Sequence, residues 1–266
     1  MRAASSHETA TAIARGVSAP ADVAAFGRVT VAVLDSALPG ELVGAYFVGS
    51  IALGGYVPGE SDVDVVAVCR RAVPDATKRA LADRLLEAAI TCPARGLELT
   101  LYRSEVASSP TTNADFELNV NGGPRMERVV RLSAVGEPRF WYVLDRAVAQ
   151  RSGVTLFGPP ADEVFAATAR HVVLQALVES VRWHREHEKA TLYSVLNACR
   201  AWRFAEDDVL GSKLEGARWA RLRWPAPTLI DAAVDLREGR PGQLDADEVD
   251  RLLGHVAGVL ARAERA

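Results

Sequence analysis

The sequence predicts an α+β protein with two domains: an amino-terminal α/β domain with a mixed sheet at residues 1–157 and an all-helical bundle at residues 158–266. Three observations predict this division. Short apolar runs alternate with helical patterns up to about residue 157. A Gly158-Pro159-Pro160 break follows. Beyond that break, nearly every segment has helical periodicity.

Length and composition exclude several classes of protein. A chain of 266 residues with 49% hydrophobic residues can bury a large core. Its net charge of −3 argues against a protein that holds long nucleic acid by bulk charge. Three cysteines without a CxxC pair argue against a disulfide framework or a zinc site. No apolar run suits a membrane span, and residues 1–20 lack a secretory signal. We therefore expect a cytoplasmic monomer without nucleic-acid or membrane partners.

The first domain is predicted to alternate helices and strands. The run VGAYFV is short and rich in β-forming residues, and DVDVVAV is predicted as a second strand. LELTLY alternates apolar and polar residues, and Pro74 suits a first helical turn. Ser, Thr, Asn and Pro make 105–115 a loop. The predicted helices are 20–38 and 74–90, and the predicted strands are 43–48, 62–68, 97–102 and 116–120.

The second domain is predicted as a series of helices separated by turn residues. The separators are Gly211, the Trp224-Pro225 pair and the turn at residues 239–242. The predicted helices lie near 162–187, 191–205, 212–222, 227–238 and 245–264.

Three acidic residues form the most informative pattern. Asp62 and Asp64 are two positions apart on a predicted strand, so their side chains share one face. Two carboxylates that close repel each other, and a Mg²⁺ ion with substrate phosphates relieves that repulsion. Glu98 is a carboxylate on another apolar strand, where it is predicted to be a third ligand or a general base if the two strands are neighbours.

A Gly49-Ser50 pair follows the first predicted strand, and Ser61 supplies a hydroxyl just before the acids. A glycine at a strand-to-helix turn lets backbone N–H groups approach a phosphate. A lone Asp-x-Asp or Gly-Ser pair is usually a solvated surface feature. Their order along this chain instead favours metal-assisted phosphate chemistry.

The order Gly49-Ser50, Ser61-Asp62-Val63-Asp64 and Glu98 resembles the nucleotidyltransferases that share a polymerase-β-like core. In the second half, LNACRAWRF (196–204) and GSKLEGARWA (211–220) are similar to the helical domain of the aminoglycoside adenylyltransferases. Those enzymes confer antibiotic resistance by adding AMP to a hydroxyl of streptomycin or spectinomycin. The resemblance extends from about residue 43 to residue 240.

The resemblance implies an adenylyltransferase that uses ATP as co-substrate, Mg²⁺ as cofactor and a small cationic aminoglycoside as acceptor. It implies the following roles: Asp62 and Asp64 for Mg²⁺, Glu98 as catalytic base, Gly49, Ser50, Ser61, Arg200 and Lys213 for the nucleotide, and Trp183 for the drug cleft.

The sequence departs from the family pattern in two places. The segment between Trp183 and Arg200 is about two residues shorter than in streptomycin-modifying members, and it offers Glu186 and Glu188 as the acids that would grip the drug. The family's late tyrosine is missing, and Arg237 lies near its place. We therefore predict spectinomycin ahead of streptomycin.

Other interpretations remain open at this point. Arg200 without the resemblance would be a structural ion-pair partner, and the His184 and His187 pair is interpreted as a solvated face rather than a metal site. The acceptor could be a different small molecule or, as in antitoxin-type nucleotidyltransferases, a protein side chain. A nucleotide-binding sensor without catalysis is the third alternative, and the presence of all the acids argues against it.

Overall fold

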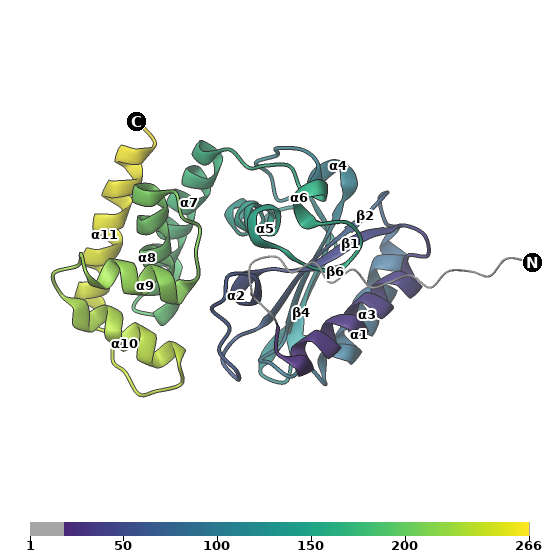
Figure 1. Cartoon of the computed structure of the whole chain (residues 1–266), viewed down its shortest axis with the longest axis horizontal. Coiled ribbons are helices and arrows are strands. Elements are labelled where there is room, and N and C mark those ends of the chain that lie inside the picture. Colours follow the sequence, from purple (N-terminus) through teal and green to yellow (C-terminus); the bar gives the residue numbers. More distant parts are fainter. Residues whose placement is uncertain (1–18, 266) are drawn as a thin grey trace, which may run out of the picture.

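The structure is a computed structural model that describes residues 19–265, and it has the predicted α+β architecture. A six-stranded sheet with its covering helices forms one part, and a bundle of helices forms the other (Figure 1). Of the segment 1–20, on which the absence of a secretory signal was predicted, residues 1–18 lie outside the described range. Within residues 19–265, no helix is both long and apolar enough to span a membrane.

The sheet is mixed, as predicted. Its order is β5-β4-β3-β2-β1-β6, in which β2 and β3 run parallel and the other neighbours run antiparallel. The parallel pair lies at the centre, where both faces are covered. The strands are β1 (Leu42–Phe47), β2 (Val63–Cys69), β3 (Leu97–Arg103), β4 (Phe116–Gly123), β5 (Met126–Arg131) and β6 (Val154–Phe157).

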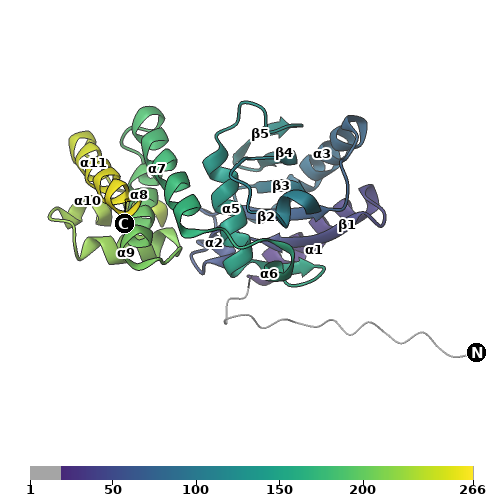
Figure 2. The ribbon, with the colours of Figure 1, turned by 90° about the horizontal axis from the view of Figure 1, so that it is seen from above.

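Helices cover both faces of the sheet. The long helices α1 (Ala21–Ala37) and α3 (Asp75–Ala89) pack on one face and share a core with the inward residues of β1, β2 and β3. The helix α5 (Arg139–Ser152) covers the opposite face, which is turned toward the bundle (Figure 2). The short helices are α2 (Gly49–Ala52), α4 (Ser104–Ala107) and α6 (Ala161–Val164).

The helical bundle surrounds the buried helix α8, whose apolar residues form a second core with its neighbours. Its first helix, α7, packs against α5 and so joins the two parts. The bundle helices are α7 (Arg170–His187), α8 (Leu192–Asp207), α9 (Lys213–Arg221), α10 (Pro227–Arg237) and α11 (Ala246–Ala263).

The structure differs from the sequence prediction in several places. The helix expected at 162–187 is two helices, α6 and α7, because the chain is extended at Phe165 and regains helical geometry only at Arg170. The helix α6 packs on α5 and β1, and thus on the sheet, although it lies beyond the predicted boundary at residue 157. The elements β5, α5 and β6 were not predicted. The loop expected at 105–115 begins with the short helix α4.

Candidate active site

The three predicted acids meet at the end of the sheet where the central strands β2 and β3 begin. Strands β2 and β3 are parallel neighbours, and Asp64 on β2 lies directly opposite Glu98 on β3. Asp62 lies one residue before β2 begins and shares the face of Asp64 through the two-residue period of a strand. The predicted convergence of Asp62, Asp64 and Glu98 is therefore present.

The Gly49-Ser50 pair is packed against Asp64. Gly49 begins α2 with φ of +54°, a conformation that glycine adopts at little cost. A Cβ atom at this position would lie 1.9 Å from Asp64 Oδ2, so a side chain has no room. The Ser50 N–H donates to the same oxygen over 3.4 Å, and the Ser50 hydroxyl is buried without a hydrogen-bond partner among residues 19–265. This unpaired donor is suited to a phosphate oxygen.

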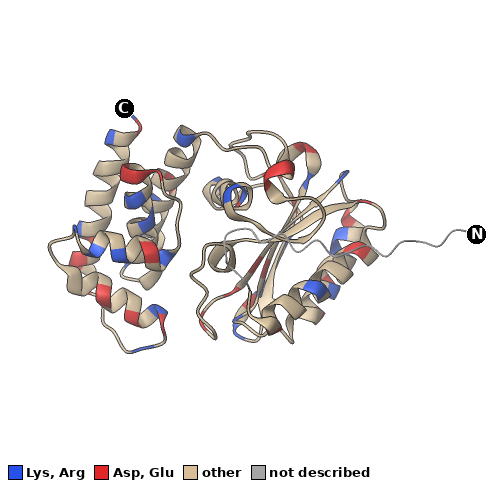
Figure 3. Ribbon diagram, in the orientation of Figure 1, with Lys and Arg blue, Asp and Glu red and all other residues tan. Residues whose placement is uncertain are grey.

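Two cations from the bundle face the acids. Arg200 lies on α8 and Lys213 is the first residue of α9, whose capping box pairs Ser212 with Glu215. A Cβ on Gly216 would come within 3.0 Å of the Arg200 backbone, so this glycine allows α9 to approach α8 closely. The Arg200 Nε donates to the carbonyl of Gly211 over 3.0 Å, which fixes the side chain. Basic segments of α8 and α9 are visible in Figure 3.

One cavity joins the acids of the sheet to the cations of the bundle. It has a volume of about 370 Å³, within the usual size of small-molecule sites. Residues from both parts of the chain line it, and they include Gly49, Ser50, Asp62, Asp64, Arg95, Glu98, Trp141, Asp145, Ser180, His184, Glu188, Tyr193, Asn197, Arg200, Lys213 and Arg237.

The acids in the cavity hold their protons more tightly than free carboxyl groups. Burial, and then the neighbouring Asp64 carboxylate, raises the pKa of Asp62 to about 6. Burial and the carboxylates of Asp64 and Asp62 likewise raise the pKa of Glu98. Solvent reaches the Glu98 side chain through the open cavity, but the nearby carboxylates of Asp64 and Asp62 still raise its pKa.

The pKa of Lys213 is shifted in the direction opposite to that of the acids. Burial, together with the charges of Arg200 and Arg237, lowers the pKa of Lys213 to about 8. The Lys213 ammonium also lies 4.9 Å from the centre of the Tyr193 ring. Cations that repel one another at one end of a cavity are suited to a polyanion such as a triphosphate.

The other end of the cavity contains a hydrogen-bonded histidine. His184 is buried, and its Nδ1 lies 2.9 Å from Glu188 Oε2 while its Nε2 lies 2.9 Å from Asn197 Nδ2. These partners fit a neutral ring that donates from Nδ1 to Glu188 and accepts from Asn197 at Nε2. The prediction that His184 lies on a solvated helix face is therefore wrong, because His184 is only 1% exposed. Its hydrogen bond holds Glu188 at the cavity wall.

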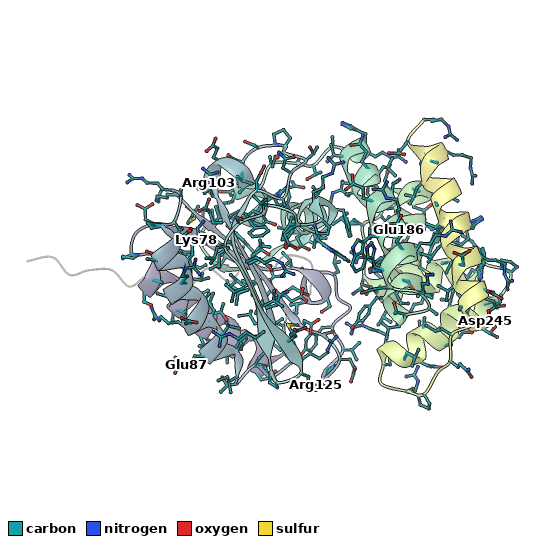
Figure 4. The ribbon with its side chains drawn as sticks, turned by 180° about the vertical axis from the view of Figure 1, so that it is seen from behind. Lys78, Glu87, Arg103, Arg125, Glu186 and Asp245 are labelled. Atoms are coloured by element: carbon teal, nitrogen blue, oxygen red, sulfur yellow. The ribbon has the colours of Figure 1, made fainter. Side chains whose placement is uncertain are left out.

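The structure corrects the expected positions of three side chains. Trp183 does not line the cavity but stacks on His187 at 5.1 Å and packs edge-on against Trp141, which does line it. Glu186 is exposed on α7, outside the cavity (Figure 4). Ser61 is buried beneath the cavity, where its Oγ accepts hydrogen bonds from the Val57 N–H and from the Arg237 guanidinium of the bundle.

Several cavity residues were not anticipated from the sequence. Asp145 of α5 is a fourth acid, and burial followed by the Asp64 carboxylate raises its pKa to about 7. Trp141, Leu144, Asp145 and Val148 all face the cavity, and their spacing of three and four residues is the recognisable signal of one helix face. Arg95 had no comparable signal, because only the fold brings it close to Asp62.

The acid pair has the properties of an incomplete metal site. Asp62 Oδ1 is buried without a hydrogen-bond partner among the described residues, and Asp64 accepts only the long bond from Ser50. Over residues 19–265, no three Asp, Glu, His or Cys side chains converge closely enough to hold a metal ion by themselves. Two neighbouring carboxylates with few hydrogen-bond partners fit a Mg²⁺ ion whose other oxygen ligands come from phosphate groups.

Replacing Asp62 with asparagine is expected to stabilise the ligand-free protein at pH 8. The folded pKa of about 6 lies above the ordinary 3.8, so the folded state binds more protons than the unfolded chain between these values, and stability falls as the pH rises through them. Asp62→Asn should therefore gain roughly 1–2 kcal/mol at pH 8 and much less at pH 4. Thermal unfolding at both values measures this, with exposed Asp35→Asn as the control. A melting temperature lowered at pH 8 contradicts the expectation.

The chain is similar in sequence to several known proteins. Residues 163–261 match the model of the aminoglycoside adenylyltransferase C-terminal domain. A spectinomycin 9-adenylyltransferase of Staphylococcus aureus is 27% identical, covering 77% of this chain and 80% of the relative. An aminoglycoside (3'') (9) adenylyltransferase of Klebsiella pneumoniae is 26% identical, covering 87% and 92%.

The fold also has a solved counterpart. The crystal structure of a spectinomycin adenyltransferase from Enterococcus faecialis, with ATP and spectinomycin, superposes with a TM-score of 0.69 at 16% identity and covers 88% of this chain and 98% of that one. The matched region takes in both the sheet and the bundle. The sequence of this chain is thus similar to those of aminoglycoside adenylyltransferases, and its two-part fold is similar to that of the solved spectinomycin adenyltransferase.

Proposed function

We propose that this protein transfers AMP from ATP to a hydroxyl group of an aminoglycoside and releases pyrophosphate. The observation that carries the proposal is the single cavity in which Asp62, Asp64 and Glu98 of the sheet face Arg200 and Lys213 of the bundle. The names of the relatives, which are spectinomycin and aminoglycoside adenylyltransferases, support the same reaction.

The nucleotide is expected at the end of the cavity next to Gly49. Arg200 and Lys213 would donate to phosphate oxygens, as would the unpaired hydroxyl of Ser50. Asp62 and Asp64 would hold Mg²⁺, which when bound neutralises charge on the phosphates. Because a polyanion stabilises the charged ammonium, ATP binding should raise the depressed pKa of Lys213.

Glu98 is expected to act as the general base. Its place beside Asp64 puts it next to the phosphate site, and its raised pKa makes it a better proton acceptor than an ordinary glutamate. The acceptor oxygen forms a bond to the α-phosphorus, the bond to the bridging oxygen of pyrophosphate breaks, and the hydroxyl proton passes to Glu98.

The acceptor is expected at the end of the cavity formed by α5 and α7. Glu188 and Asp145 are carboxylates that would attract the amines of an aminoglycoside, and Trp141 supplies an apolar wall. Trp183, the residue that the family resemblance connects with streptomycin, lies behind Trp141 and outside the cavity. This arrangement supports our choice of spectinomycin as the preferred acceptor.

Purified protein with ATP and Mg²⁺ should release pyrophosphate when spectinomycin is added, and the drug should gain the mass of one AMP group. Streptomycin under the same conditions tests the preference between the drugs. Release with streptomycin alone would reverse the preference. ATP consumption that no aminoglycoside stimulates would point to a different acceptor, and absence of ATP binding would contradict the nucleotidyltransferase assignment.

A further inference from the structure

The two acids that would hold the metal ion are positioned by different parts of the molecule. Asp64 lies inside β2, where strands on both sides fix the backbone. Asp62 precedes β2, which begins at Val63, and ends the loop that follows α2. The position of Asp62 therefore depends on whatever holds this loop.

The side chain of Arg237, which belongs to the bundle, holds the loop before Asp62. Arg237, the last residue of α10, is 6% exposed. Its Nη1 donates to the Glu60 carbonyl over 2.6 Å, and its Nη2 donates to Ser61 Oγ over 2.7 Å. The same Ser61 oxygen accepts the Val57 N–H over 2.9 Å, which closes the turn of the loop. One guanidinium thus grips the two residues that immediately precede Asp62.

A second contact from the bundle acts on the Asp62 carboxylate indirectly, through Arg95. The Arg95 guanidinium lies 3.8 Å from Asp62 Oδ1 and donates through its Nη1 to the Tyr193 hydroxyl of α8 over 2.5 Å. Tyr193 therefore fixes the cation that faces Asp62. Side chains of the bundle thus hold both the backbone before Asp62 and the cation that faces its carboxylate.

We propose that Arg237 is a positioning residue that places Asp62 for metal-dependent nucleotide binding when the helical bundle is docked on the sheet. The proposal rests on the proposed function, because it takes Asp62 as an acid that would hold Mg²⁺. Ser61 then serves the nucleotide site through Arg237 and not by touching a phosphate. The competing role for Arg237, which also lines the cavity, is direct contact with the phosphates.

Calorimetric titration with a non-hydrolysable ATP analogue distinguishes the two roles. With Mg²⁺ present, Arg237→Met and Ser61→Ala should weaken binding by roughly 10- to 100-fold for the arginine and less for the serine, since charge-assisted hydrogen bonds are lost. With EDTA in place of Mg²⁺, both variants should bind the analogue nearly as well as the unsubstituted protein. Arg237→Lys, which keeps the charge and one donor group, should recover part of the loss.

Arg240→Met is the matched control, because Arg240 follows the same helix, is exposed and pairs with Asp235 and Glu238. It should bind the analogue normally in both titrations. Thermal unfolding without ligand shows whether each variant is folded. If Arg237→Met is not folded, Ser61→Ala and Arg237→Lys carry the test, because each removes only part of the contact.

The Asp62→Asn background gives the deciding measurement. If Arg237 acts through Asp62, Arg237→Met should weaken Mg²⁺-dependent binding by less than about threefold once Asp62 is asparagine, because effects that share one path are not additive. The proposal is overturned in favour of phosphate contact if Arg237→Met weakens nucleotide binding as strongly in the Asp62→Asn protein as in the unsubstituted protein. It is likewise overturned if Arg237→Met weakens binding equally with and without Mg²⁺. Unchanged binding in Arg237→Met also overturns it. If the unsubstituted protein binds no nucleotide, the proposed function fails and takes this proposal with it.

Discussion

Glu98→Gln is expected to reduce AMP transfer by about 10²–10⁴-fold while ATP binding stays nearly intact. Glutamine keeps the size of the side chain opposite Asp64 but cannot accept the hydroxyl proton. It also removes one negative charge beside Asp64 and Asp62, so nucleotide binding should be unchanged or slightly stronger. Steady-state rates of pyrophosphate release and calorimetric titration with ATP measure the two properties separately.

Glu186→Gln is the matched control for this substitution. Glu186 is an exposed glutamate of α7 outside the cavity, so the same chemical change there should leave transfer within about twofold of the unsubstituted rate (Figure 4). A Glu98→Gln protein that transfers AMP at more than a tenth of the normal rate would remove Glu98 from the role of base. Loss of ATP binding in Glu98→Gln would instead assign Glu98 to the nucleotide site.

The pH dependence of transfer gives independent information on Glu98. A general base works in its charged form, so the rate should rise as the pH rises through its pKa. Because burial and two neighbouring carboxylates raise this pKa, the rising limb should lie above the usual range of a glutamate, whose ordinary pKa is 4.5. A limb at the ordinary pKa would show that bound substrates cancel the influence of these neighbours.

The acids could be found from the sequence because local rules determine most of their geometry. The two-residue period of a strand places Asp62 and Asp64 on one face, whatever the rest of the fold is. Their meeting with Glu98 required a long-range pairing of β2 with β3, which the sequence suggested only as a condition. The helices of the bundle were predicted well because turn residues separate strongly periodic segments.

The missed elements lack such signals. Half of the residues of the edge strand β5 are charged and none is buried, and β6 has only four residues, so neither has the apolar pattern of a buried strand. The helix α5 has arginines and an aspartate within its apolar pattern, although its cavity-facing residues recur at helical spacing. Asp145 was missed together with this helix.

The phase of a helix explains the corrected drug-cleft residues. Neighbouring residues of a helix point about 100° apart, so Trp183 and His184 cannot face the same cavity equally. His184 of α7 and Glu188, the residue that ends the helix, line the cavity, while Trp183 and His187 stack on the adjacent side of α7. Glu186 lies farther round the helix and is exposed. The family resemblance identified the segment around Trp183 as part of the drug cleft, but only the three-dimensional structure shows which of its residues face the cavity.

Gly49→Ala should inactivate the enzyme far more than its effect on folding alone would suggest. The alanine must adopt φ of +54° and would place its Cβ 1.9 Å from Asp64 Oδ2. The left-handed conformation costs about 1–2 kcal/mol. The overlap must then be relieved by moving either the Asp64 carboxylate or the loop that carries the Ser50 N–H. A displacement of about 1 Å at reacting groups can cost 10²-fold, so we expect transfer to fall by at least about 100-fold.

Gly40→Ala separates the two effects, because Gly40 has φ of +71° and an added Cβ there would meet nothing within 4 Å. Both variants should lose a similar 1–2 kcal/mol from the left-handed conformation, measured by denaturant unfolding, and Gly49→Ala should lose more because of the overlap. Only Gly49→Ala should lose Mg²⁺-dependent ATP binding and transfer. If the two alanine variants are equally active, the close packing of Gly49 on Asp64 does not shape the site. If Gly49→Ala binds and transfers normally despite its lower stability, the nucleotide phosphates do not depend on the positions of Asp64 and Ser50 in this structure, because the added Cβ overlaps Asp64 Oδ2 unless one of these residues moves.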